Sequence, residues 1–116
     1  MEKVLNFRDL GLSETTLEAI GKKGYETPSP IQALCIPRLL DGTKDVIGQA
    51  QTGTGKTAAF SLPIIDRIER ENYVQAIILA PTRELVIQVA EEISSLKGDK
   101  RLRVLPIYGG SNIQHQ

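Results

Sequence analysis

Residues 50–57 read AQTGTGKT, and this glycine-rich stretch decides what the chain can fold into. It follows a short apolar segment, 45–48, and precedes apolar residues at helical spacing, so we place it between a strand and a helix. Glycines let successive backbone N–H groups turn toward one anion, and the following helix adds its own unpaired N–H groups. Lys56 supplies a positive charge and Thr57 a hydroxyl for Mg²⁺. The stretch predicts a phosphate-binding loop, and the plain alternative is a glycine turn with an exposed lysine.

Helical spacing and capping residues predict helices from Ser13 to about residue 23, from Ser29 to about residue 41, from about Lys56, and from about Arg83. Short apolar runs predict strands at 45–48, 75–80 and 103–108. Two helices followed by alternating strands and helices predict an α/β fold, with a parallel sheet flanked by helices.

Composition sets limits on the partners. The chain has 116 residues, enough for one small domain, and its formal net charge is zero. That balance leaves no broad basic surface for nucleic acid, so any such contact must come from a few placed donors. The single cysteine, Cys35, lies in an apolar stretch and is interpreted as a core residue. No long apolar run is present, so we expect no membrane span, no secretory signal and a cytoplasmic protein.

Several segments together resemble one protein family. Residues 24–32, GYETPSPIQ, resemble the Q motif of DEAD-box helicases, with Phe7 as the upstream aromatic. Residues 50–57 match that family's phosphate loop, in which alanine comes first, and residues 81–85, PTREL, match its next motif. Gly109 and Gly110, followed by Gln116, match the one after that, so the resemblance covers essentially the whole chain.

The resemblance implies a partial RecA-like P-loop fold. Residues 1–33 would be the Q-motif segment, and residues 34–116 the N-terminal part of the helicase ATP-binding domain. The Asp-Glu-Ala-Asp motif of the family, which supplies the general-base carboxylate, does not occur in the chain. We therefore expect these residues to bind nucleotide without turnover, as part of an ATP-dependent RNA helicase that unwinds local RNA duplexes. The alternative is another P-loop nucleotide-binding protein or a small-molecule kinase.

The implied nucleotide site takes ATP and Mg²⁺. Gln32 would pair with the Hoogsteen edge of adenine, since an amide can both donate and accept there; it also fits a capping box with Ser29. Phe7 or Tyr25 would stack on the base, or else serve in the core and in a turn, respectively. Lys56 and Thr57 would have the catalytic roles, with Thr57 as a metal ligand. The full nucleotide-binding set is Phe7, Tyr25, Thr27, Gln32, Ala50, Gln51, Thr52, Gly53, Thr54, Gly55, Lys56 and Thr57.

The implied RNA site contacts the sugar-phosphate backbone. Its members are Pro81, Thr82, Arg83, Gly109 and Gly110. A helix N-terminus with a hydroxyl and a guanidinium suits a phosphodiester, and glycines allow a strand to approach closely. The alternatives are a helix cap with a surface arginine, and a plain turn after a strand. Unpaired edges of the predicted sheet would also favour self-association of the chain.

Overall fold

The computed structural model describes residues 6–43, 45–49, 55–69, 73–98 and 100–109. Within them lie the α-helices α1 (Glu14–Lys22), α2 (Pro30–Asp41), α3 (Lys56–Arg67) and α4 (Arg83–Leu96). The observed bounds of these helices agree with the predicted bounds to within a residue or two, wherever a bound was predicted. A short 3₁₀ helix, η1 (Phe7–Leu10), was not predicted. It forms because Asn6 and Asp9 cap it reciprocally, each side chain accepting from the backbone N–H of the other.

Local chemistry explains where two of the helices begin. The hydroxyl of Ser29 caps α2 and Pro30 takes its first position, where no N–H is needed. Thr82 Oγ1 accepts from the backbone N–H of Leu85 at 3.1 Å and caps α4. Ser13 stands at the cap position of α1, but its hydroxyl makes no cap bond there. The predicted cap position of Ser13 is therefore confirmed, but its side chain does not cap the helix.

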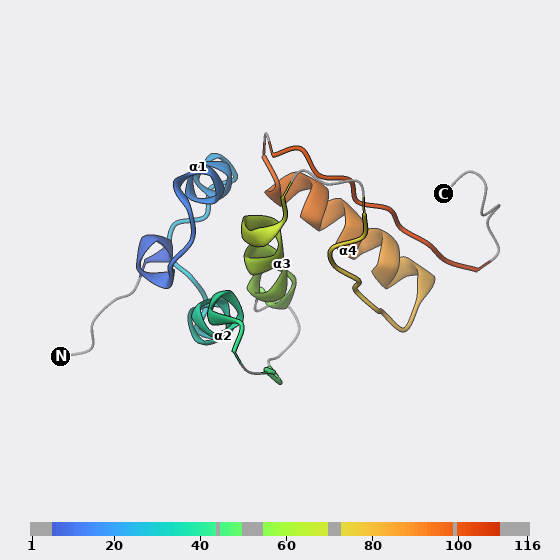
Figure 1. The fold of residues 1–116 in the computed structure, drawn as a ribbon, viewed down its shortest axis with the longest axis horizontal. Helices are drawn as coiled ribbons and strands as arrows, with labels where there is room; N and C mark the ends of the chain where they lie inside the picture. The colour runs from blue at the N-terminus through green and yellow to red at the C-terminus, as the bar shows by residue number, and fades with distance from the viewer. Residues whose placement is uncertain (1–5, 44, 50–54, 70–72, 99, 110–116) are drawn as a thin grey trace.

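Helix α3 is the central element. It contacts α1, α2 and α4, and Figure 1 shows α1 and α2 on one side of it and α4 on the other. Leu62 and Ile65 of α3 are buried together with Ile20, Ile36 and Leu96 from the three neighbouring helices. Burying such side chains contributes about 1.5–3 kcal/mol each. The start of α3, just after the glycine-rich stretch, is thereby held by the core of the protein.

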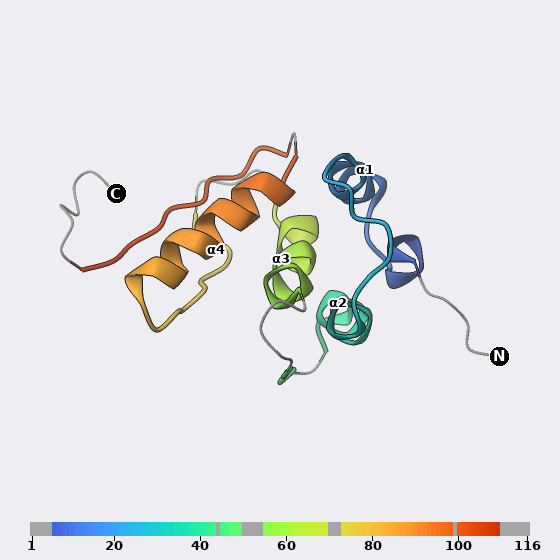
Figure 2. The same cartoon turned by 180° about the vertical axis from the view of Figure 1, so that it is seen from behind.

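The predicted parallel sheet is wrong for the residues that the structure describes. Segments 45–49, 74–80 and 101–108 contain no strand. Figures 1 and 2 show residues 101–108 running alongside α4. Leu79 is 91% exposed and Ile47 is 95% exposed, whereas Ile78 and Leu102 pack against the core.

These segments therefore bury part of their apolar surface, where a parallel sheet covered by helices would bury both faces. The prediction rested on apolar composition, which marks segments that favour burial. A strand exists only where another segment supplies ladder hydrogen bonds, and composition does not contain that information. The expected self-association through sheet edges has no support here, since the described residues form no sheet. None of the described helices has the length and apolar character to cross a membrane.

Asp66 joins the end of α3 to the start of α1. Its Oδ1 accepts from the backbone N–H of Ser13 at 3.0 Å and from the hydroxyls of Ser13 and Thr16 at 2.6 Å each. The Lys100 ammonium donates to the backbone oxygens of Ile65 and Asp66. Partial burial opposes ionisation, but the hydrogen bonds from Ser13 and Thr16 and the nearby Lys100 outweigh it and hold the pKa of Asp66 below its ordinary value.

Replacing Asp66 by alanine is expected to lower the free energy of unfolding by about 1–3 kcal/mol near pH 7, because the buried hydroxyl of Thr16 loses its acceptor. A carboxylate whose pKa is lowered on folding stabilises the fold above its unfolded-state pKa, and this contribution is lost as the pH falls through the folded-state pKa. The difference between variant and wild type should therefore shrink below about pH 4.

Urea unfolding at pH 7 and at pH 3 measures this difference. Asp45→Ala is the matched control, because Asp45 is exposed and has no hydrogen bond or ion pair within the described residues. Equal stability of Asp66→Ala and wild type at pH 7 would show that the junction between α1 and α3 does not depend on this carboxylate.

Candidate functional site

The described part of the predicted phosphate loop begins at Gly55. Gly55 has φ 85° and ψ 27°, a left-handed conformation that favours glycine, and it stands at the cap position of α3. Lys56 and Thr57 form the first turn of α3, with Lys56 exposed and Thr57 half-buried. Among the described residues, no side chain caps this helix, and its first turn has no acidic residue. The helix dipole therefore makes the N-terminus of α3 electropositive, which favours an anion.

Gln32 connects the Q-motif segment to this loop. Its Oε1 accepts from the backbone N–H of Ser29 at 2.9 Å, and its Nε2 donates to the carbonyl oxygen of Gly55 at 3.3 Å. The side chain is 6% exposed. The capping role that the sequence allowed is thus present. The same amide also contacts the loop residue that begins α3, which the sequence did not reveal.

The two aromatic candidates lie against each other. The rings of Phe7 and Tyr25 have centroids 5.9 Å apart and are inclined by 42°. Phe7 is buried in the core cluster, while Tyr25 is half-buried and donates its hydroxyl to Glu92 at 3.1 Å. Burial and the Glu92 carboxylate both raise the pKa of Tyr25. The structure contains the core packing proposed as the alternative for Phe7; Thr27 nearby in sequence is exposed.

The predicted RNA residues gather at the start of α4. Thr82 caps this helix, and Pro81 and Arg83 beside it are exposed. The Arg83 guanidinium carbon lies 4.7 Å from the centroid of the Tyr108 ring, and Tyr108 directly precedes Gly109. The structure thus brings both predicted RNA segments to one end of α4. A side chain at Gly109 would meet open space, so no atom of the described residues requires a glycine there.

Part of the predicted site lies outside the described residues. Ala50, Gln51, Thr52, Gly53, Thr54 and Gly110 belong to this part. Among the described residues, no group of three or more His, Cys, Asp or Glu side chains is placed to hold a metal ion. Thr57 offers a single hydroxyl, so a bound Mg²⁺ would need phosphate oxygens and water for the rest of its shell.

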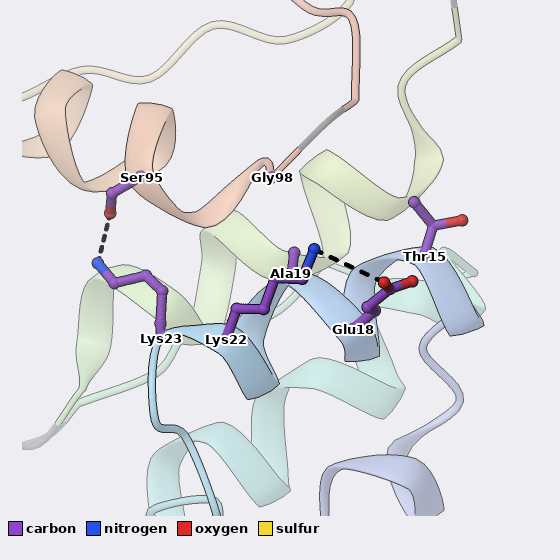
Figure 3. Close-up of a pocket in the computed structure, with 7 residues that line it drawn as sticks. All are labelled: Thr15, Glu18, Ala19, Lys22, Lys23, Ser95 and Gly98. Atoms are coloured by element: carbon purple, nitrogen blue, oxygen red, sulfur yellow. Dashed lines mark hydrogen bonds and ion pairs between the residues drawn. The ribbon is translucent and has the colours of Figure 1, made fainter.

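A pocket of about 170 Å³ lies elsewhere, between α1 and the end of α4. Figure 3 shows Lys23 reaching across to Ser95, with their polar atoms 2.6 Å apart, and Lys22 paired with Glu18 on α1. None of the predicted nucleotide or RNA residues lines this pocket. It marks the contact between the two helices and is separate from the candidate site.

Known proteins resemble the chain along most of its length. The family model described as DEAD/DEAH box helicase matches residues 29–116. A DEAD-box ATP-dependent RNA helicase, CshA of Bacillus cereus, is 55% identical over 111 residues, which cover 95% of this chain and 21% of that protein. The chain therefore spans about a fifth of the length of this curated relative.

Two solved structures extend the comparison to the backbone. A DEAD box protein from the hyperthermophile Methanococcus jannaschii superposes with a TM-score of 0.91 at 49% identity, over 99% of this chain and 31% of that one. Saccharomyces cerevisiae Dbp5 bound to RNA and ADP BeF3 gives a TM-score of 0.74 at 41% identity, over 78% of this chain and 24% of that one. These likenesses support the RecA-like part of the fold prediction, although the described residues form no sheet.

Proposed function

Because the chain belongs to the DEAD/DEAH box helicase family, we propose that it is the ATP-binding portion of an ATP-dependent RNA helicase, which couples ATP binding and hydrolysis to local unwinding of RNA duplexes. The observation that carries this proposal is the hydrogen bond from Gln32 Nε2 to the Gly55 carbonyl oxygen. It joins the candidate adenine-reading residue to the candidate phosphate loop. No comparison favours a small-molecule kinase or another P-loop protein.

The hydrogen-bonding capacity of Gln32 supports adenine as the base. A primary amide has two N–H hydrogens and two oxygen lone pairs. In the structure one N–H is given to Gly55, and one lone pair accepts from Ser29. One N–H and one lone pair remain, which is the set that the N7 and N6 atoms of adenine require. Guanine presents two acceptors on the same edge, and the remaining lone pair would face one of them.

The residues at the start of α3 support the proposal that the triphosphate binds there. The exposed Lys56 ammonium and the unpaired N–H groups of the first turn attract the anionic chain of a triphosphate. Thr57 would add its hydroxyl to a Mg²⁺ held by the nucleotide. That ion, when bound, draws negative charge away from the phosphates. The residues themselves bind and orient the triphosphate.

The stacking partner of the base is part of the proposal. Either Phe7 or Tyr25 packs on adenine, and a pair of substitutions separates them. Leucine in place of the stacking residue lowers the affinity for ATP but leaves the affinity for tripolyphosphate unchanged. Leucine at the other position changes the two affinities together or not at all.

The start of α4 supports a backbone contact with RNA. Arg83 and the capping hydroxyl of Thr82 stand at a helix N-terminus, and Gly109 follows the residue that packs on Arg83. Guanidinium groups bind phosphates with paired N–H donors. Such contacts read the sugar-phosphate backbone and carry no base code.

The central test compares ATP with tripolyphosphate in the Gln32→Ala variant. Loss of the base contacts is expected to weaken ATP about tenfold, since one or two hydrogen bonds contribute about 1.4 kcal/mol together. Tripolyphosphate has no base and should bind nearly as it does to wild type. Titration calorimetry measures both affinities.

Tripolyphosphate is the internal control in this comparison, because any destabilisation of α2 or of the loop would change the affinity for both ligands alike. Gln88→Ala provides a matched external control, since Gln88 is an exposed glutamine on α4. Equal losses of ATP and tripolyphosphate affinity would mean that Gln32 only caps α2 and supports the loop, and would remove the argument for adenine.

A further inference from the structure

Tyr108 packs directly against a residue of the proposed RNA site. The Arg83 guanidinium carbon is 4.7 Å from the centre of the Tyr108 ring, within the range of a cation–π contact. Arg83 is exposed on the first turn of α4, whereas Tyr108 is half-buried. The contact therefore joins the exposed side chain of Arg83 to the half-buried side chain of Tyr108.

The segment that contains Tyr108 explains why its ring is held. Along residues 101–108 exposure alternates with a period of two, and Leu102 and Val104 pack against the hydrophobic core. Tyr108 lies on the same side of the alternation as these two residues, while Leu105 and Ile107 face solvent. The segment runs beside α4 (Figures 1 and 2), and the Tyr108 ring contacts Arg83 on the first turn of that helix. The ring is thus presented to the start of α4 by the packing of the whole segment.

Arginine at an exposed helix start has many rotamers, and fixing them on binding a ligand costs conformational free energy. A guanidinium over an aromatic face loses part of this freedom before the ligand arrives. Its N–H donors lie in the plane of the group, so the face contacts the ring while the edge stays free for a phosphate.

We propose that Tyr108 is a positioning residue that holds Arg83 ready for a phosphate of the RNA backbone. This inference rests on the proposed function, because it takes an RNA phosphate as the ligand of Arg83. It assigns a role to the residue just before Gly109, which the sequence did not single out. Tyr108 itself makes no contact with the phosphate in this proposal.

The test measures the affinity of the chain for a single-stranded oligoribonucleotide, with wild type, Tyr108→Leu, Tyr108→Phe, Arg83→Ala and the double variant Arg83→Ala/Tyr108→Leu. Tyr108→Leu is expected to weaken binding about two- to fivefold, the range for an exposed cation–π contact. Tyr108→Phe keeps the aromatic face and should restore most of the wild-type affinity. In the Arg83→Ala background, the leucine should have no further effect. Tyr73→Leu, at an exposed tyrosine, is the matched control.

A second readout reports the geometry without RNA. Ring-current shifts of the Arg83 side-chain protons in NMR spectra should be present in wild type and Tyr108→Phe and absent in Tyr108→Leu. A merely structural role for Tyr108 would not produce shifts confined to Arg83 that the phenylalanine restores. Absent shifts in wild type would overturn the positioning contact.

The outcomes separate this inference from the proposed function. If Arg83→Ala weakens RNA binding but Tyr108→Leu does not, the positioning role is wrong and the RNA contact stands. If Tyr108→Leu weakens binding equally in both backgrounds, Tyr108 acts independently of Arg83 and the inference is overturned. If Arg83→Ala binds RNA as wild type does, or if wild type does not bind RNA at low salt, both the RNA contact and its positioning fail. ATP binding is then still tested by Gln32→Ala.

Discussion

Replacing Lys56 by alanine is expected to weaken ATP binding by about 1.5–3 kcal/mol, a loss of roughly tenfold to more than a hundredfold in affinity. Lys56 is exposed on the first turn of α3, where the unpaired N–H groups already favour an anion. A hydrogen bond from an ammonium to phosphate is charge-assisted and stronger than one between neutral groups. The variant removes that donor and its charge together.

The fold should tolerate this change. Lys56 has no hydrogen bond or ion pair within the part of the chain that the structure describes, so the free energy of unfolding should change little. Lys22→Ala serves as the control, because Lys22 is an exposed helical lysine with one weak ion pair to Glu18 at 3.6 Å. Titration calorimetry with ATP compares the three proteins. An unchanged affinity in Lys56→Ala would refute the assignment of residues 50–57 as a phosphate loop.

Replacing Gly55 by alanine should destabilise the protein by about 1.5–3.5 kcal/mol and weaken ATP binding at the same time. The left-handed conformation of Gly55 (φ 85°) costs an alanine about 1–2 kcal/mol. The added Cβ would also overlap Nε2 of Gln32, so the bond from that amide to the Gly55 carbonyl would be lost. That loss adds about 0.5–1.5 kcal/mol. One methyl group thereby disturbs both the loop and the residue proposed to read adenine.

A second glycine provides a control at which alanine should raise the stability of the protein and not lower it. Gly21 lies in the last turn of α1, and an added Cβ there meets no atom within 4 Å. Alanine is more favourable than glycine in a helix, so Gly21→Ala should raise the stability by up to about 0.5–1 kcal/mol, the range for a helix interior. Urea unfolding of both variants measures the two effects. If Gly55→Ala were as stable as wild type and bound ATP equally well, the contact between Gln32 and Gly55 would contribute neither to stability nor to ATP binding.

The sequence determined the elements whose signals are local. Ser29, Pro30 and Thr82 mark helix starts because their side chains or rings act on backbone groups within three residues. Apolar residues at helical spacing likewise predicted the helices that became α3 and α4. The family followed from the order of short motifs along the chain, and the comparisons confirmed it.

The tertiary structure decided what depends on partners far away in the sequence. It left residues 74–80 and 101–108 without strands, because ladder hydrogen bonds need a second segment that apolar composition does not specify. It paired Gln32 with Gly55, and Asp66 with Ser13 and Thr16, across 23, 53 and 50 residues. It also placed Tyr108 under Arg83. Contacts of this kind form only when segments far apart in the sequence pack together, so no local pattern in the sequence could have predicted them.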